Sequence, residues 1–149
     1  MGTPDAFVER WNAPLSEQAS VTFALAQNPQ PQSTYGDTAN AFVEAQGLKP
    51  IGFNWELLDP YAAPGEPRSA LGTMAEAMAH HMEYPSREWL GEAAALQCAQ
   101  DFVDLFDAAD RTILTNRFGD LWNPLTDARI EWGFVGFDTR HAGLLVLTI

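Results

Sequence analysis

The stretch DLWNPLTDARIEWGFVGFDTRHAGLLVLTI, residues 120–149, decides the fold of this chain. A Trp-Asn-Pro turn is followed by a predicted strand over 129–137, a loop over 138–143 and a last strand over 143–149. From Leu144 to Ile149 both alternating faces are apolar except at Thr148, which is typical of a strand covered on both sides. We therefore expect this strand to lie inside a sheet, with the rest of the chain covering it.

The upstream sequence predicts more strands and two longer helices. Period-two alternation predicts strands over 19–26 and 51–58, and the second pattern is the clearest in the chain. Apolar residues at helical spacing predict helices over 69–84 and 87–107, and the second carries two apolar stripes, so we expect it across the sheet. A short helix is expected to begin at Thr3-Pro4-Asp5. Segment 111–118 fits a strand or a helix, and its β-branched residues favour a strand.

These elements predict one α+β domain over residues 1–149, with a mostly antiparallel sheet and the two longer helices packed over it. A length of 149 residues is enough for one self-sufficient core. The Gln/Pro-rich stretch 27–33 is expected to be an extended surface loop. The single cysteine, Cys98, falls within a helical pattern, which favours a small buried side chain over a reactive thiol. The strand order and the oligomeric state stay open at this point.

The charge balance is the strongest compositional signal. Twenty acidic residues face eight basic ones, for a formal net charge of −12, and Lys49 is the only lysine. Because phosphate neutralisation supplies most non-specific affinity for nucleic acids, direct nucleic-acid binding is not expected. The apolar runs are too short to cross a bilayer and the N-terminus lacks a signal pattern, so we expect no membrane partner and a cytoplasmic protein. The acidity is consistent with simple solubility or with a basic protein partner.

Glu76, His80 and Glu83 form the first candidate for chemistry. Their spacing of i, i+4 and i+7 places them on one face of the predicted 69–84 helix, where they could hold a metal or act as acid and base. That face lies opposite the apolar stripe and should point to water, whereas metal ligands need a supporting shell. We therefore expect a solvated face and no metal or cofactor. Nucleophile, phosphate-loop and redox motifs are missing from the sequence, so no catalytic residue is predicted.

A ladder of aspartates at steps of three is the second candidate: Asp101, Asp104, Asp107 and Asp110. This spacing predicts a ridge of carboxylates at the C-terminal end of the 87–107 helix, where the helix dipole already disfavours negative charge. Arg111 and Arg117 are expected to offset part of that repulsion. Three interpretations are open: a solvated face held by those arginines, a docking surface for a basic partner, or a calcium or magnesium site. The EF-hand pattern is missing, which disfavours the last.

Tryptophans supply a further signal. There are five, which is many for this length. Trp122, in the Leu-Trp-Asn-Pro turn, is the one that periodicity explains least. A tryptophan in such a place can close one end of a sheet–helix sandwich, or it can act as an interface anchor beside the acidic ridge.

Two functions from different classes fit this sequence. The first is a small acidic module that inhibits or sequesters a basic protein, such as a toxin or a nucleic-acid enzyme, through Asp101, Asp104, Asp107, Asp110 and Trp122. Bacterial immunity proteins and phage-encoded inhibitors are functional analogies for it, based on size, acidity and the missing catalytic motif. The second is a small enzyme or a ligand- or metal-binding domain that uses the Glu76/His80/Glu83 face or a pocket near Trp122.

Overall fold

A computed structural model of the chain describes residues 2–28 and 34–149, so most of the predicted loop over 27–33 lies outside the described residues. Five strands form one sheet in which every neighbouring pair is antiparallel. Their order across the sheet is β1 (Ser20–Gln27), β7 (His141–Thr148), β6 (Glu131–Phe137), β3 (Thr112–Thr115) and β2 (Glu56–Leu58). A separate small hairpin pairs β4 (Arg117–Phe118) with β5 (Leu121–Trp122). The α+β prediction is confirmed.

The last strand is covered on both sides, as its sequence predicts. β7 lies between β1 and β6, and Leu144 to Leu147 are all fully buried. Leu145 and Leu147 belong to one apolar cluster, whereas Leu144 and Val146 belong to the cluster on the opposite face. Each face of this strand therefore contributes to a different half of the core.

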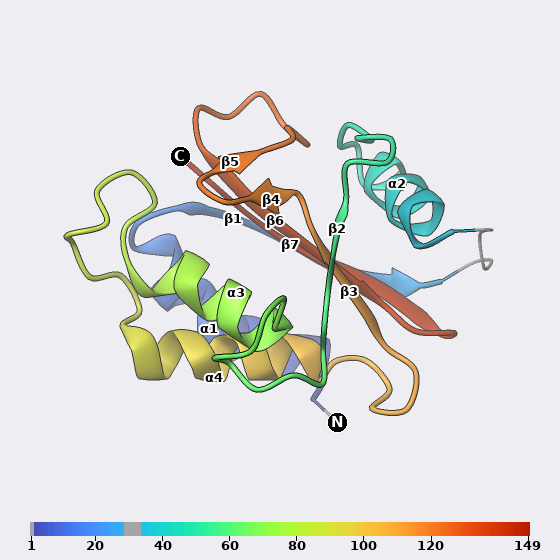
Figure 1. Cartoon of the computed structure of the whole chain (residues 1–149), viewed down its shortest axis with the longest axis horizontal. Coiled ribbons are helices and arrows are strands. Elements are labelled where there is room, and N and C mark those ends of the chain that lie inside the picture. Colours follow the sequence, from blue (N-terminus) through green and yellow to red (C-terminus); the bar gives the residue numbers. More distant parts are fainter. Residues whose placement is uncertain (1, 29–33) are drawn as a thin grey trace.

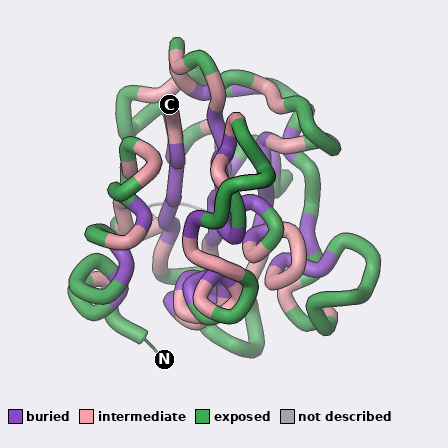
Figure 2. Tube along the Cα trace, turned by 90° about the vertical axis from the view of Figure 1, so that its left-hand side faces the viewer, coloured by how far each residue is buried: buried purple, intermediate pink, exposed green. Residues whose placement is uncertain are grey.

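The helices form the two outer layers (Figure 1). One face of the sheet is covered by α1 (Pro4–Ser16), α3 (Ala70–Ala79) and α4 (Glu92–Val103). The other face is covered by α2 (Tyr35–Ala45) together with Ile51 and Trp55 from the following turn. Figure 2 shows buried segments gathered in the middle of the molecule and exposed loops around them. Among the described residues, none of the helices combines the length and the apolar character that crossing a membrane needs.

α1 begins where the local sequence predicts, whereas the two longer predicted helices are shorter than expected. Thr3 caps α1, and its hydroxyl accepts a hydrogen bond from the N–H of Ala6 at 3.2 Å. The predicted helix over 69–84 ends at Ala79, because His80 is extended and forms a bridge with Glu88. The predicted helix over 87–107 spans only Glu92–Val103. Beyond it the chain turns, and Phe106 becomes fully buried against the sheet.

The predicted strand over 51–58 is mostly a turn, and β2 keeps only its last part. Gly52 has φ +63°, which favours glycine, and Phe53 is 100% exposed, against the expected alternation. The side chain of Asn40 in α2 holds this turn: its Oδ1 accepts from the N–H of Ile51 and from the indole of Trp55, and its Nδ2 donates to the Gly52 carbonyl. In 111–118, by contrast, the predicted strand is confirmed as β3 and β4.

Asp138 joins the β6–β7 hairpin to the segment that follows α4. One carboxylate oxygen accepts from the N–H groups of Arg140 and His141 at 2.8 and 2.7 Å, and the other accepts from the N–H of Asp107 at 2.8 Å. Burial alone would raise the pKa of Asp138, but these hydrogen bonds and the nearby His141 lower it below its ordinary value. The ionised carboxylate is therefore part of the folded structure.

We expect Asp138→Asn to lower the free energy of unfolding by about 1–2 kcal/mol at neutral pH, because one acceptor becomes a donor facing the N–H groups. A pKa that is lowered by folding contributes stability above the ordinary aspartate pKa, and this contribution is lost as the pH falls through the folded value. Urea unfolding between neutral and acid pH should thus show a steeper acid loss for wild type than for the variant. Exposed Asp110→Asn is the matched control; an equal loss in both variants would contradict the assignment.

Candidate functional site

Asp101, the first aspartate of the predicted ladder, accepts hydrogen bonds from other side chains of the same chain. Asp101 accepts hydrogen bonds from the Trp11 indole at 2.8 Å, from Arg10 at 3.2 Å and from Gln97 at 2.8 Å. Because Arg10 and Trp11 lie in α1, the Asp101 carboxylate ties α1 to α4. Its role in the fold is to join two helices.

The other three aspartates do not continue that ridge. Asp104 is the C-cap of α4 and accepts from Gln100 and Arg111 at 3.0 and 3.4 Å. Asp107 and Asp110 follow the helix in an exposed turn, where Asp107 accepts from the N–H of Ala109. The expected relief by Arg111 is therefore present at Asp104, whereas Arg117 lies at a different place in the fold. The four carboxylates do not share one helical face.

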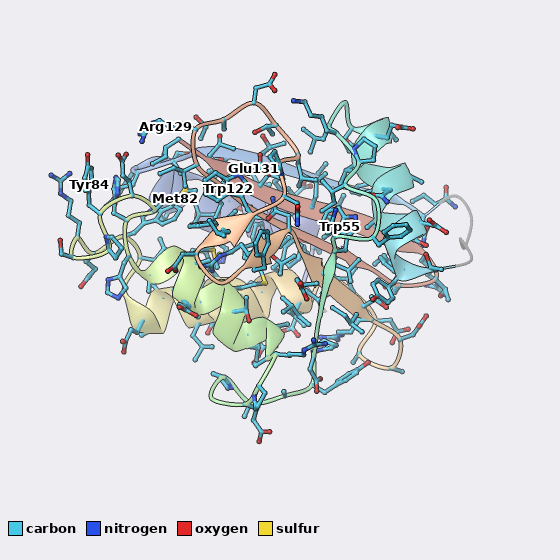
Figure 3. The ribbon with its side chains drawn as sticks, turned by 45° about the horizontal axis from the view of Figure 1, so that its top comes forward. Trp55, Met82, Tyr84, Trp122, Arg129 and Glu131 are labelled. Atoms are coloured by element: carbon cyan, nitrogen blue, oxygen red, sulfur yellow. The ribbon has the colours of Figure 1, made fainter. Side chains whose placement is uncertain are left out.

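Trp122 also lies away from this segment. It belongs to β5, and its ring packs edge-on against Trp132 of β6, with ring centroids 5.6 Å apart. Figure 1 places β5 at one side of the sheet and the C-terminal end of α4 at the opposite side of the molecule. The structure therefore does not bring Trp122 beside Asp101, Asp104, Asp107 and Asp110. Figure 3 shows Trp122 near Glu131 and below the loop that joins β5 to β6.

Glu76, His80 and Glu83 do not lie on one helical face, because α3 ends at Ala79. Glu83 instead accepts a 2.6 Å bond from Arg129, which lowers the pKa of Glu83 below its ordinary value. All three nevertheless line one cavity of about 370 Å³. The cavity is completed by Arg117, Asp120 and Trp132, and by His81 and its neighbours. Within the described part of the chain, no group of three or more histidine, cysteine, aspartate or glutamate residues is arranged to hold a metal ion.

Arg117 is the most unusual side chain in this cavity. Its guanidinium carbon lies 4.2 Å from the centre of the Trp132 ring, in a cation–π contact. Its terminal nitrogens donate to the carbonyls of Thr73 and Gly119 at 3.5 and 3.4 Å, while its buried Nε has no hydrogen-bond partner. Burial lowers the pKa of Arg117 below its ordinary value, and the charges of Glu76 and Asp120 act in the opposite direction.

A second cavity of about 420 Å³ adjoins the first, because Glu76, Arg117 and Asp120 line both. It also includes Leu57 of β2 and Phe118 of β4. We call the two cavities together the hairpin cleft, since it lies between α3 and the β4–β5 hairpin. Gly119 has a φ of +65°, which allows the tight turn of that hairpin. On either side of this turn, Phe118 and Asp120 line the hairpin cleft.

Exposed apolar side chains lie in the hairpin cleft or beside it, since Leu57 and Phe118 line it and Leu121 pairs with Phe118. Leu57 is 38% exposed, Phe118 is 42% exposed and Leu121, its partner in the hairpin, is 60% exposed. The turn that carries Phe53 lies close by, because the Asn123 side chain donates to the Asn54 carbonyl at 3.4 Å. Several large apolar side chains that are left to solvent around one concave site are typical of an interaction surface. Sequence reasoning singled out Glu76, His80 and Glu83, which line this site, but it missed the apolar side chains, although the Phe-Gly-Asp-Leu turn was their local signal.

Cys98 is buried in α4, as the sequence predicts, and burial raises its pKa far above the ordinary value. A thiol with so high a pKa is not a nucleophile at neutral pH.

In the comparisons with known proteins, no protein-family model, no curated protein and no solved structure matches this chain. The function of the chain is therefore inferred from the residues that line the hairpin cleft.

Proposed function

We propose that this protein is an acidic docking module that binds a basic protein at the hairpin cleft. The observation that carries the proposal is that exposed apolar side chains and carboxylates that accept no ion-pair contact lie at the same cleft. Glu56, Glu76 and Asp120 line it together with Arg68 and Arg117. Within the described residues none of the three carboxylates forms an ion pair, although burial lowers the pKa of Arg117 and the charges of Glu76 and Asp120 act in the opposite direction. Leu57, Phe118 and Leu121 supply the apolar surface beside them.

This arrangement suits a partner with lysine or arginine side chains around an apolar patch. Apolar side chains that become buried at the centre of an interface supply most of the affinity, whereas rim charges mainly raise the association rate and select the partner. The net charge of −12 adds long-range attraction toward a basic surface. Such a module would inhibit a toxin or a nucleic-acid enzyme by covering the basic surface that binds the substrate.

The hairpin cleft is a better candidate than the aspartate segment for this role. Asp101 and Asp104 already accept hydrogen bonds from arginines of the same chain, so a partner would have to displace those contacts. Asp107 and Asp110 remain exposed, yet the large exposed apolar side chains named above lie at the cleft. A docking site needs both kinds of side chain, and the cleft has them.

Capture from lysate of the source cells, followed by titration of the purified partner, tests the proposal. Three variants should be compared with wild type: Phe118→Ser/Leu121→Ser, Glu56→Gln/Asp120→Asn, and the control Asp107→Asn/Asp110→Asn. We expect the first to weaken binding about tenfold or more through lost apolar burial. The second should mainly slow association and reduce its salt dependence. Binding that is lost in the aspartate control and kept in the other two variants would overturn the proposal and favour the aspartate segment.

A small-molecule site is the second candidate function, and one observation favours it: Glu76, His80, His81 and Glu83 all line the cavity of about 370 Å³ beside Arg117. Such a cavity is of the size that takes a small ligand. A thermal-shift screen of metal ions and metabolites should then give a ligand whose stabilisation is lost in His80→Ala. Stabilisation that persists in His80→Ala would count against this second function.

A further inference from the structure

The free edge of β1 has the properties of a pairing surface. This strand has eight residues, Ser20–Gln27, and all eight pair with β7 on one side. Within the described part of the chain, the backbone groups of β1 make no hydrogen bond to any element other than β7. Ser20, Thr22, Ala26 and Gln27 are exposed. The outer row of N–H and C=O groups is therefore available to another strand.

The two edges of the sheet differ in how they are protected. At the opposite edge, β2 has only three residues, begins with exposed Glu56 and runs into a loop in which Asp59 bridges to Ser69. Short length and charge are the usual ways to prevent unwanted strand pairing. β1 has neither, because Ser20–Gln27 contains no charged residue and no proline.

We infer that β1 pairs antiparallel with β1 of a second copy, so that two five-stranded sheets become one continuous sheet across a two-fold axis. A second copy fits this edge best because two like-charged molecules repel least where the strand of each is uncharged. The pairing is also closed: each copy uses its β1 edge once, and the edges that remain are the short β2 strands.

The faces of the sheet limit the register of this pairing. Directly opposite residues in an antiparallel pair point to the same face, so each residue must meet one of the same face in the second copy. Val21, Phe23 and Leu25 pack against the cluster of α1, α3 and α4, whereas Ala24 packs against the cluster of α2. With the greatest overlap, the two-fold axis therefore passes at Phe23 or at Ala24. Phe23 is already fixed by stacking on Phe7, with ring centroids 4.8 Å apart.

This inference is independent of the docking proposal, and salt separates the two. Docking to a basic partner should weaken as salt rises, because screening removes the attraction. Pairing of two copies, each with a net charge of −12, should strengthen as salt rises, because screening removes the repulsion. The hairpin cleft and the β1 edge belong to opposite edges of the sheet, so a failure at one leaves the other intact.

Sedimentation equilibrium of the purified chain from micromolar to sub-millimolar concentration tests the pairing, at low and at moderate salt. Thr22→Lys and Thr22→Glu are the test variants, since Thr22 is exposed at the middle of β1. We expect wild type to form a dimer that salt strengthens, and both variants to weaken it about tenfold or more, because each buries a charge in the new ladder. A general effect of net charge would instead change dimerisation in opposite directions in the two variants.

Hydrogen exchange of wild type below and above the dimerisation midpoint supplies the second readout. Amides of residues 20–27 should gain protection with concentration, and circular dichroism should confirm that both Thr22 variants stay folded. A chain that remains monomeric over the whole range overturns the inference. So does a dimer that both variants leave unchanged, or one whose concentration-dependent protection lies outside β1.

Discussion

Glu131→Gln is expected to lower the free energy of unfolding by about 3 kcal/mol, and the melting temperature by on the order of 10 °C. Glu131 is fully buried in β6, and its two oxygens accept from Asn116 at 2.6 Å, from the N–H groups of Leu125 and Thr126 at 2.8 and 2.9 Å, and from the Thr126 hydroxyl. Glutamine has the same shape but directs an NH₂ group at donors. Because buried donors without an acceptor are costly, the loss should be large.

The measurement is urea and thermal unfolding of Glu131→Gln beside Glu44→Gln, an exposed glutamate on α2. The control should change stability by no more than about 0.5 kcal/mol. In the Glu131 variant we also expect faster hydrogen exchange at the amides of Leu125 and Thr126, since the carboxylate fixes that loop. Equal stability of the two variants would show that the buried carboxylate does not organise the loop.

Gly136→Ala is expected to cost about 1–3 kcal/mol through overpacking. A Cβ atom at this position would lie 2.3 Å from Cε2 of Phe106 and 3.0 Å from Cδ1 of Ile113. Both side chains are fully buried, so neither can retreat into solvent. Gly136 pairs with Gly143 in the β6–β7 ladder, and the Phe106 ring lies above this pair of glycines. Chemical denaturation of the variant gives the cost directly.

Two companion variants make that prediction specific. Gly65→Ala is the control, because a Cβ atom there would meet nothing within 4 Å. Combining Gly136→Ala with Phe106→Leu removes ring atoms that the new methyl group would strike. The double variant should then lose less stability than the sum of the two single variants, which a double-mutant cycle measures. Strict additivity would mean that the Phe106 ring is not what excludes a side chain at Gly136.

Patterns that are local in sequence predicted the sheet well. Leu144 to Leu147 alternate between two buried faces, so their own sequence shows that the strand is covered on both sides. β-branched residues in 111–118 favoured a strand because such residues are common in strands, and β3 spans Thr112–Thr115. Thr3 and Pro4 marked the start of α1, because a helix N-terminus depends on its own first residues.

Features that depend on distant residues could not be predicted. The alternation in 51–55 failed because Asn40, on a different element, fixes a turn there. α4 ends early, and Phe106 beyond it packs on Gly136 and Gly143, which lie in strands far along the chain. The aspartate ladder looked like a free ridge because its spacing shows charge but not the partners that Asp101 finds in α1.

The hairpin cleft was out of reach for the same reason. It needs Glu56, Glu76 and Arg117, which come from three elements that only the folded chain brings together. The exposure of Leu57, Phe118 and Leu121 is likewise a property of the tertiary structure. The spacing of Glu76, His80 and Glu83 did point to this region, although they meet through a cavity beyond the end of α3 and not along one helical face.

The measurement that tests the docking proposal most directly is a hydrogen-exchange footprint of the chain in complex with its purified basic partner. We predict new protection in residues 53–58 and 117–122, which include the rim of the hairpin cleft, and little change in residues 101–110. Phe118→Ser/Leu121→Ser should remove that protection under the same conditions. Protection confined to residues 101–110, with residues 53–58 and 117–122 exchanging as in the free chain, would contradict the proposal.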